Sequence, residues 1–179
     1  MKFTCKVCGS HSYSPYKDLW YCSSCSVLFK DFGQFSLEPV YFKKLDKDAT
    51  LPKRTNETDI GYDVTSIDVV VIKPGETVMV QTGLSVELPK NTEIQVRPRS
   101  GMAKKYGIMV TNSPGTIDTG YRGPCNVLLT NTGKEVYPIA KGDRIAQFVI
   151  TTKMPYEIIE VDSISSSDRG ESGFGDSGK

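Results

Sequence analysis

The chain has 179 residues, of which 38% are hydrophobic and 24% charged, and its formal net charge is +1. This length is enough for one core of ordinary size with a small appendage, and the near-neutral balance gives no global field that would draw the protein onto nucleic acid or a membrane. No apolar run approaches the roughly 18 residues of a membrane span and no signal peptide is recognisable, which predicts a cytoplasmic protein (in the host cytoplasm if the source is viral).

Four of the five cysteines lie in residues 1–30 and form two Cys-x-x-Cys pairs, Cys5 with Cys8 and Cys22 with Cys25, separated by 13 residues. Four thiolates complete a tetrahedral zinc shell, so this spacing predicts a structural Zn²⁺ site that resembles a zinc ribbon. A segment this short has too little core to fold unaided, and the metal would supply the folding free energy. The residues leave open whether its partner is a protein or a nucleic acid.

Residues 31–49 are predicted to form a linker that leads into a first strand at YFKKL, which would pair with the following domain. Residues 50–162 form the predicted β-domain, because short β-branched runs alternate there with turn sequences such as KPGE and NTGK. This texture favours an all-β sandwich, jelly roll or barrel, with one short helical turn at SGMAKKYG. The expected strands are Val69–Ile72, Thr77–Val80, Leu84–Leu88, Glu93–Arg97, Gly107–Thr111, Cys125–Asn131, Arg144–Thr151 and Glu157–Val161.

Residues 163–179 are rich in Ser and Gly and cannot bury enough apolar surface to fold alone, which predicts a flexible C-terminal arm. The arm contains a Gly-x-Gly-x-x-Gly spacing over 173–178, but phosphate loops of that kind need a preceding strand and a following helix. We therefore exclude a dinucleotide-binding fold and a P-loop. The arm retains one phosphate-seeking group, Arg169, and one stacking ring, Phe174.

Three segments of the β-domain carry side chains that suit phosphate or acid–base chemistry. Residues 97–101 place two arginines, a serine and a glycine at a strand end, a pattern typical of phosphate binding or of surface ion pairs. Residues 112–123 form a hairpin-like stretch with a carboxylate that could take a proton from water, or an ordinary capped turn. Residues 142–147 begin a strand with an Asp-Arg pair, which is more often structural, and with Gln147, whose amide could bind phosphate.

Taken in order, five segments resemble the motifs of the trimeric dUTPases. They are residues 61–64, 98–103, 115–123, 142–147 and 169–175. The resemblance covers roughly residues 50–179 and implies a jelly-roll-like β-barrel that assembles as a homotrimer, with three active sites at subunit interfaces. It also implies hydrolysis of dUTP to dUMP and pyrophosphate, which keeps uracil out of DNA and supplies dUMP for dTTP synthesis.

The same resemblance implies roles for individual residues. Asp118 would activate the water that attacks the α-phosphate, and Tyr121 would stack under the deoxyribose and exclude a 2′-hydroxyl. Mg²⁺ would sit on the triphosphate with Asp63 in its outer shell. The implied uracil contacts are Asn112, the backbone around Thr116, Ile117 and Asn126, and Phe174 of a third chain. The implied phosphate contacts are Arg99, Ser100, Gly101, Gln147 and Arg169.

Two other functions stay open at this stage. A dCTP deaminase-like enzyme on the same fold would need a general-base glutamate in the segment that here carries Asp118 and Tyr121. A zinc-ribbon binding or regulatory protein with a vestigial dUTPase domain would need no turnover. The chain departs from the family pattern at Gly120, Pro124, Ser172 and Asp176, none of which has an implied catalytic role.

Overall fold

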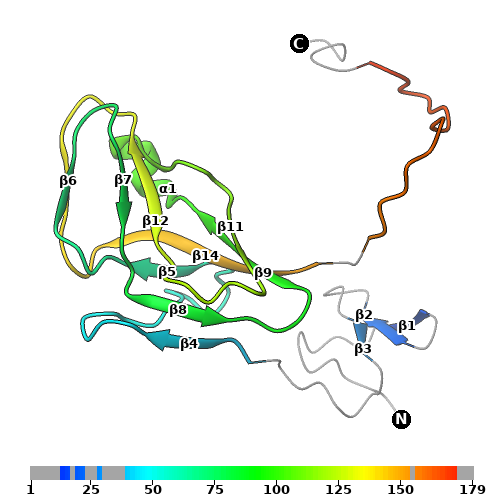
Figure 1. The fold of residues 1–179 in the computed structure, drawn as a ribbon, viewed down its shortest axis with the longest axis horizontal. Coiled ribbons are helices and arrows are strands. Elements are labelled where there is room, and N and C mark those ends of the chain that lie inside the picture. The colour runs from blue at the N-terminus through cyan, green and yellow to red at the C-terminus, as the bar shows by residue number, and fades with distance from the viewer. Residues whose placement is uncertain (1–12, 17–18, 23–27, 30–38, 154–155, 173–179) are drawn as a thin grey trace.

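The computed structural model describes residues 13–16, 19–22, 28–29, 39–153 and 156–172 (Figure 1). These residues form strands and one short helix, in agreement with the all-β prediction. Within the described residues, no helix is long and apolar enough to cross a membrane. The strands are β1 Tyr13–Tyr16, β2 Leu19–Cys22, β3 Leu28–Phe29, β4 Tyr41–Lys44, β5 Tyr62–Thr65, β6 Val70–Ile72, β7 Thr77–Val80, β8 Leu84–Glu87, β9 Thr92–Arg97, β10 Ile108–Val110, β11 Gly115–Asp118, β12 Val127–Asn131, β13 Tyr137–Ile139 and β14 Arg144–Thr152, and the helix is α1 Ser100–Tyr106.

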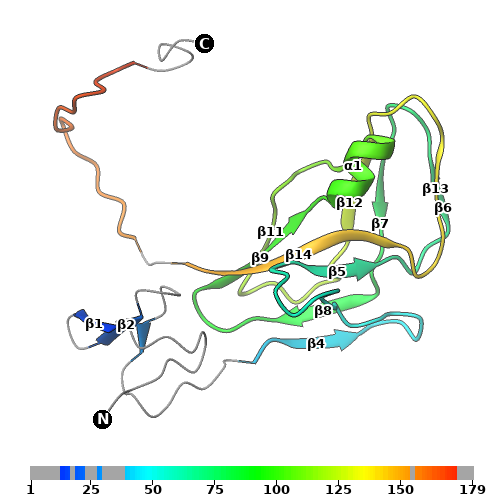
Figure 2. The ribbon, with the colours of Figure 1, turned by 180° about the vertical axis from the view of Figure 1, so that it is seen from behind.

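The β-domain is a barrel-like arrangement of small antiparallel sheets (Figures 1 and 2). Its largest sheet has the order β11-β9-β14-β5, and a three-stranded sheet has the order β10-β12-β7. The pairs β4-β8 and β13-β6 complete the structure. Neighbours in these sheets are mostly distant in sequence, so each sheet brings together side chains that no local pattern joins.

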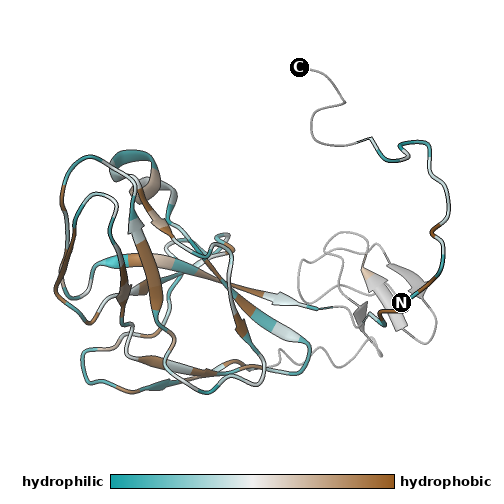
Figure 3. Ribbon diagram, turned by 45° about the horizontal axis from the view of Figure 1, so that its top comes forward, coloured by the Kyte–Doolittle hydropathy of each residue, from teal (hydrophilic) through white to brown (hydrophobic). Residues whose placement is uncertain are grey.

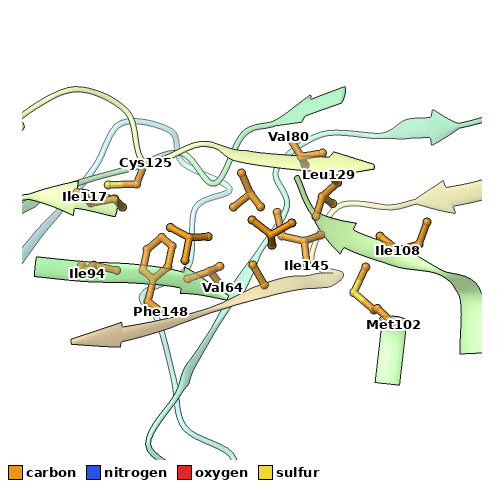
Figure 4. Close-up of a cluster of buried hydrophobic side chains, with 14 of the residues drawn as sticks. Val64, Val80, Ile94, Met102, Ile108, Ile117, Cys125, Leu129, Ile145 and Phe148 are labelled. Carbon is orange, nitrogen blue, oxygen red and sulfur yellow. The ribbon is translucent and has the colours of Figure 1, made fainter. Parts of the chain in front are cut away.

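The core lies between the two larger sheets. Residues alternate along β12, where Val127, Leu129 and Asn131 are buried while Leu128 is exposed, as expected for a strand with one face toward the core. Ile94 and Phe148 on one side face Val80 and Leu129 on the other (Figure 4). Hydrophobic residues accordingly concentrate along the strands, and hydrophilic residues along many of the turns (Figure 3).

Helix α1 follows β9 directly and presents Ser100 at its first position. Arg99 is still extended, with φ −83° and ψ 126°, so the chain turns into the helix at this residue. Met102 is 5% exposed and anchors the helix to the core, while Lys104 and Lys105 lie in the last turn, where positive charge is favourable. The predicted helical turn is therefore confirmed.

Most of the predicted strands are confirmed to within two residues at each end, but two expectations are wrong. The run 157–161 forms no strand, because among the described residues no strand lies beside it, and Ile158 is 98% exposed. The hairpin expected over 112–123 is absent, since β11 pairs with β9 instead of folding back locally. Long-range pairing with β9 has overridden the local pattern at β11, and the absence of a described partner strand leaves 157–161 without regular structure.

Residues 31–38 of the expected linker lie outside the described residues. Strand β4 lies within the segment 31–49 and pairs with β8, as predicted for YFKKL. Ala49 is also buried, so the β-domain begins earlier than residue 50. Strands β1, β2 and β3 form a small antiparallel sheet inside residues 1–30. Cys22 ends β2 and is buried, whereas Cys5, Cys8 and Cys25 lie outside the described residues, and the zinc ribbon stays a prediction.

Candidate active site

A polar pocket of about 440 Å³ opens where β5, β9, α1 and β14 meet. We call it the arginine pocket, because three guanidinium groups reach its wall. Its lining residues are Thr55, Asp59, Ile60, Gly61, Asp63, Arg97, Pro98, Arg99, Ser100, Gly101, Arg144, Gln147 and Val149. All four predicted phosphate contacts from the β-domain are therefore brought together in one pocket, and Asp63 joins them.

Asp63 organises this pocket through two ion pairs. Its Oδ1 accepts a hydrogen bond from Arg99 Nε at 3.1 Å, and its Oδ2 accepts one from Arg144 Nη1 at 2.9 Å. The Asp63 side chain is only 16% exposed, so these bonds are less screened than those of a surface pair. Arg144 therefore pairs across the sheet, and the structural ion pair that the Asp-Arg sequence suggested is not made with its neighbour Asp143, whose Oδ2 accepts Ala140 N–H instead.

A β-bulge places Arg144 and Gln147 in the same pocket. Residues three apart on a regular strand point to opposite faces. In β14 the register with β5 shifts between Arg144 and Ala146, which adds one residue and returns Gln147 to the face of Arg144. Gln147 pairs in register with Asp63 on β5 and with Arg97 on β9, so its amide lies among the charged groups.

Gly61 leaves space for the Gln147 amide at the pocket wall. A Cβ at position 61 would lie 2.2 Å from Gln147 Oε1 and 3.2 Å from its Cβ. Any larger residue would therefore push the amide away from the position it now holds. This explains the glycine in the sequence Gly61-Tyr62-Asp63 as a packing requirement of the pocket.

A second, less polar pocket of about 280 Å³ lies along β11 and the chain that follows it. We call it the β11 pocket. Its lining residues are Met79, Val96, Asn112, Gly115, Thr116, Ile117, Asp118, Tyr121, Pro124, Cys125, Asn126, Val127 and Leu128. It contains every predicted uracil contact from the β-domain, together with Asp118 and Tyr121, and it shares no lining residue with the arginine pocket.

Strand β11 contributes backbone as well as side chains to this pocket. It is an edge strand, because it pairs with β9 on one side and, within the described residues, with no strand on the other. The N–H and C=O groups on its second edge are therefore available to a flat polar ligand. Thr116 and Asp118 are exposed while Ile117 is 7% exposed and packs inward, so the strand holds the Asp118 carboxylate at the surface.

Tyr121 is held in place by the turn that follows β11. Its N–H donates to Asp118 O at 3.0 Å, and its hydroxyl donates to Pro124 O at 3.0 Å. A Cβ on residue 123 would lie 2.6 Å from the ring carbon Cζ, so Gly123 lets the ring fold against the backbone. One edge of the ring is thus fixed, and the side chain still remains 45% exposed.

Two of the groups that line the β11 pocket are buried. Asn126 donates from Nδ2 to Met79 Sδ at 3.5 Å, and its Oδ1 is buried without a partner in the described part of the chain. A buried acceptor of this kind is normally paired, so a ligand N–H would satisfy it. Beside it, burial raises the pKa of the Cys125 thiol to about 11, which keeps the thiol neutral near pH 7.

The predicted site residues thus separate into three groups. Asn112, Thr116, Ile117, Asp118, Tyr121 and Asn126 line the β11 pocket, and Asp63, Arg99, Ser100, Gly101 and Gln147 line the arginine pocket. Arg169 lies on the arm, where its Nε donates to Ser172 O, and Phe174 is outside the described residues. The sequence analysis noted Arg97 only as part of the basic strand end 97–101 and gave no site role to Arg144 or Met79. Arg144 lies inside a recognised segment, but its place in the pocket depends on the bulge.

The chain that forms these pockets is similar to known proteins of one family. The sequence model of the dUTPase family matches residues 47–178. A deoxyuridine 5′-triphosphate nucleotidohydrolase of Clostridium acetobutylicum is 50% identical over 136 residues, which cover 76% of this chain and 94% of the relative. The enzyme of the same name from Gloeothece citriformis is 48% identical and covers 75% of this chain and 93% of its own length.

Solved structures give the same result at the level of the fold. A dUTPase mutant of Staphylococcus bacteriophage 80alpha, solved with dUpNHpp, superimposes with a TM-score of 0.75 at 30% identity over 80% of this chain and 100% of that one. A mutant dUTPase of phage phi11, described as coordinating a structural Mg(II) ion, gives a TM-score of 0.66 at 25% identity over 70% of this chain and 98% of that one. With the family model spanning the β-domain and both pockets, this chain belongs to the dUTPase family.

Proposed function

We propose that this chain is a dUTP diphosphatase that hydrolyses dUTP to dUMP and pyrophosphate as a homotrimer. One observation carries the proposal: each chain presents a basic pocket and a separate, less polar pocket with a carboxylate, and together these provide what a nucleoside triphosphate requires. In a closed ring of three, the arginine pocket of one chain would face the β11 pocket of the next. The relatives carry the dUTPase name, which favours this reaction over dCTP deamination.

The β11 pocket would select uracil. The free edge of β11 offers backbone donors and acceptors to the base edge, with Asn112 beside them. The N3–H of uracil would donate to the unpaired Oδ1 of Asn126. Cytosine has no hydrogen on N3, so it would leave that buried oxygen unpaired, and a site built in this way discriminates strongly. Tyr121 would pack against the deoxyribose and leave no room for a 2′-hydroxyl.

Asp118 would act as the general base. Asp118 is the last residue of β11, and its exposed carboxylate lines the pocket. A water molecule between this carboxylate and the α-phosphate would contact both groups. Asp118 takes a proton from that water while the water oxygen bonds to the α-phosphorus. The bond from that phosphorus to the bridging oxygen breaks, and pyrophosphate leaves.

The arginine pocket would hold the phosphates, through Arg99, Ser100, Gly101 and Gln147. The C-terminal arm would then close over the substrate, with Arg169 at the γ-phosphate and Phe174 over the uracil, and would exclude bulk water.

Magnesium fits this pocket as a water-mediated ligand. Both Asp63 oxygens already accept a bond from a guanidinium group, so direct coordination would compete with two cations, whereas their remaining lone pairs can accept from metal-bound water. The ion, bound mainly by the substrate triphosphate, would neutralise charge that develops on the leaving pyrophosphate.

The N-terminal module would be a structural zinc ribbon. Support comes from the two Cys-x-x-Cys pairs and from the antiparallel β1-β2-β3 sheet between and beside them. Protein purified without chelator would contain one zinc per chain by elemental analysis, and a zinc-free preparation that retains the folded sheet would contradict the ribbon.

A pyrophosphate-release assay across dUTP and the four standard dNTPs tests the proposed activity. We expect turnover with dUTP alone, and ammonia release from dCTP would identify a deaminase instead. Asp118→Asn is expected to retain dUTP binding and to lower kcat by about 10²–10⁴-fold, the usual effect of losing a general base. Near-normal turnover of this variant would remove Asp118 from its role.

A further inference from the structure

Of the three guanidinium groups in the arginine pocket, that of Arg97 has no carboxylate partner among the described residues. Arg99 and Arg144 share Asp63, and the other acid on the wall, Asp59, accepts from the backbone and side-chain nitrogens of Asn56. Arg97 instead donates from Nε and Nη2 to the neutral oxygen Oε1 of Gln95, at 3.1 and 2.5 Å. Among the ion pairs of the described residues Arg97 has none, and it is exposed on the pocket wall.

Arg97 is also held in one orientation by a line of side chains along β9. Gln95 Nε2 donates to Glu93 Oε1 at 3.1 Å, and the same oxygen accepts from Thr151 on β14 at 3.2 Å. Lys153 Nζ lies 3.9 Å from Glu93 Oε2. Positions 93, 95 and 97 share one face of β9, so the hydrogen-bonded side chains of Glu93, Gln95 and Arg97 lie in a row that ends at the arginine pocket. The bond from Gln95 is the main cause of the lowered Glu93 pKa.

Arg97 retains N–H donors that can bind an anionic ligand. A guanidinium group has five N–H bonds, of which Gln95 takes two, so three remain for phosphate oxygens. In register beside Arg97 lies Gln147, one of the proposed phosphate contacts. If water activated by Asp118 attacks the α-phosphate, that phosphate lies at the β11 pocket, and the β- and γ-phosphates extend into the arginine pocket.

We propose that Arg97 binds the two terminal phosphates of dUTP and the pyrophosphate product, and that Gln95 and Glu93 are positioning residues for it. This inference rests on the proposed function, because that function sets the direction in which the triphosphate lies. Its physical basis is that a charge with a neutral partner stays available to the ligand, and that a fixed side chain loses little entropy on binding. The α-phosphate and dUMP lie outside its reach.

Calorimetric titration of the full-length chain with pyrophosphate and with dUMP distinguishes binding of the terminal phosphates from an effect of Arg97 on every ligand. Arg97→Gln is expected to weaken pyrophosphate binding by about ten-fold or more, as for the loss of a charged hydrogen bond, with dUMP binding unchanged. The KM of Arg97→Gln for dUTP would rise along with its Kd for pyrophosphate. Lys134→Gln removes the same charge from an exposed bend that lines neither pocket and serves as the matched control. Arg97→Lys keeps the charge without the fork and would restore part of the affinity.

Gln95→Glu tests the positioning step without removing Arg97. The new carboxylate would pair with the guanidinium, so pyrophosphate binding would weaken nearly as much as in Arg97→Gln. Pyrophosphate affinity within two-fold of wild type in Arg97→Gln would overturn the inference, and so would an equal loss of dUMP affinity or a change in assembly state. Because pyrophosphate binding is measured without turnover, a wild-type chain inactive on dUTP would refute the proposed function separately.

Discussion

The two pockets of this chain are built in different ways. The arginine pocket gathers residues from four separate elements and is held by charge: Asp63 joins β5 to Arg99 before α1 and to Arg144 on β14. The β11 pocket draws most of its lining from the continuous stretch 112–128 and is held by turns, close packing and neutral hydrogen bonds. The first is organised by long-range electrostatics and the second by local backbone geometry, so they respond to different perturbations.

The largest expected effect comes from mixing chains that are defective in different pockets. Asp118→Asn and Ser100→Ala homotrimers would each be impaired, yet co-refolded 1:1 mixtures would regain about a quarter of the wild-type sites if each site uses one pocket from each of two neighbours. The measurement is dUTP hydrolysis before and after co-refolding. Mixtures no more active than the sum of their parents would mean that both pockets of a site come from a single chain.

Asp63→Ala is expected to disrupt the arginine pocket while sparing the other. Two guanidinium groups lose their shared acceptor, which costs about 1–3 kcal/mol in stability and misplaces Arg99 for phosphate. Chemical denaturation at fixed protein concentration and pyrophosphate titration measure the two parts. Asp59→Ala removes the same charge from the same wall without releasing an arginine; equal damage in both variants would show that charge, and not the ion pairs, sets the effect.

High pH is expected to weaken the β11 pocket through Cys125. Its folded pKa is about 11 against 9.0 for an ordinary thiol, and the residue is 1% exposed. Because the folded pKa is raised, the stabilisation is complete below pH 9 and is lost as the pH rises through 11, up to about 2–3 kcal/mol at about 1.4 kcal/mol per pKa unit. Unfolding free energies of wild type and Cys125→Ala, measured from pH 8 to 11, isolate this titration from those of lysine and tyrosine; parallel curves would contradict it.

The smallest expected effects come from adding one methyl group to each pocket. Gly61→Ala would displace the Gln147 amide and weaken pyrophosphate binding, and Gly123→Ala would displace the Tyr121 ring and reduce the preference for dUTP over UTP. Each change is expected to cost about 1–2 kcal/mol in its own ligand contact, a factor of 5–30. Both variants are measured by pyrophosphate titration and by the kcat/KM ratio for dUTP and UTP. If Gly61→Ala changed the dUTP preference, or Gly123→Ala changed pyrophosphate binding, the pockets would be coupled within one chain.

The same difference explains which features could be predicted from the sequence. The β11 pocket is nearly contiguous along the chain, so its residues could be located together from the sequence, although the pairing partner of β11 could not. The arginine pocket depends on the bulge in β14 and on pairing between β5, β9 and β14, neither of which leaves a local signal. Arg97 was therefore visible only as part of a basic strand end, and Arg144 only as one half of an Asp-Arg pair.

Residues 157–161 have a clear local strand pattern but form no strand. Their composition predicts a strand, but a strand also needs a neighbouring edge, and the described residues offer none beside them. Tyr156, Ile158 and Ile164 are therefore 85%, 98% and 89% exposed. The β-branched composition of this run suits a strand, but composition does not specify the neighbouring strand with which it would have to pair.

The exit of the arm from the β-domain has a consequence for the lifetime of the enzyme. A backbone hydrogen bond from Lys153 N to Asn91 O, 2.6 Å long, holds the end of β14 to the domain, and residues 156–172 beyond it run exposed (Figure 2). A trypsin-like protease that cuts after Lys153 would leave the core and both pockets intact and would remove Arg169 and Phe174 in one step. In the proposed homotrimer the nicked chain would still supply its two pockets to the ring, and one site of the three would lose the arm that covers it.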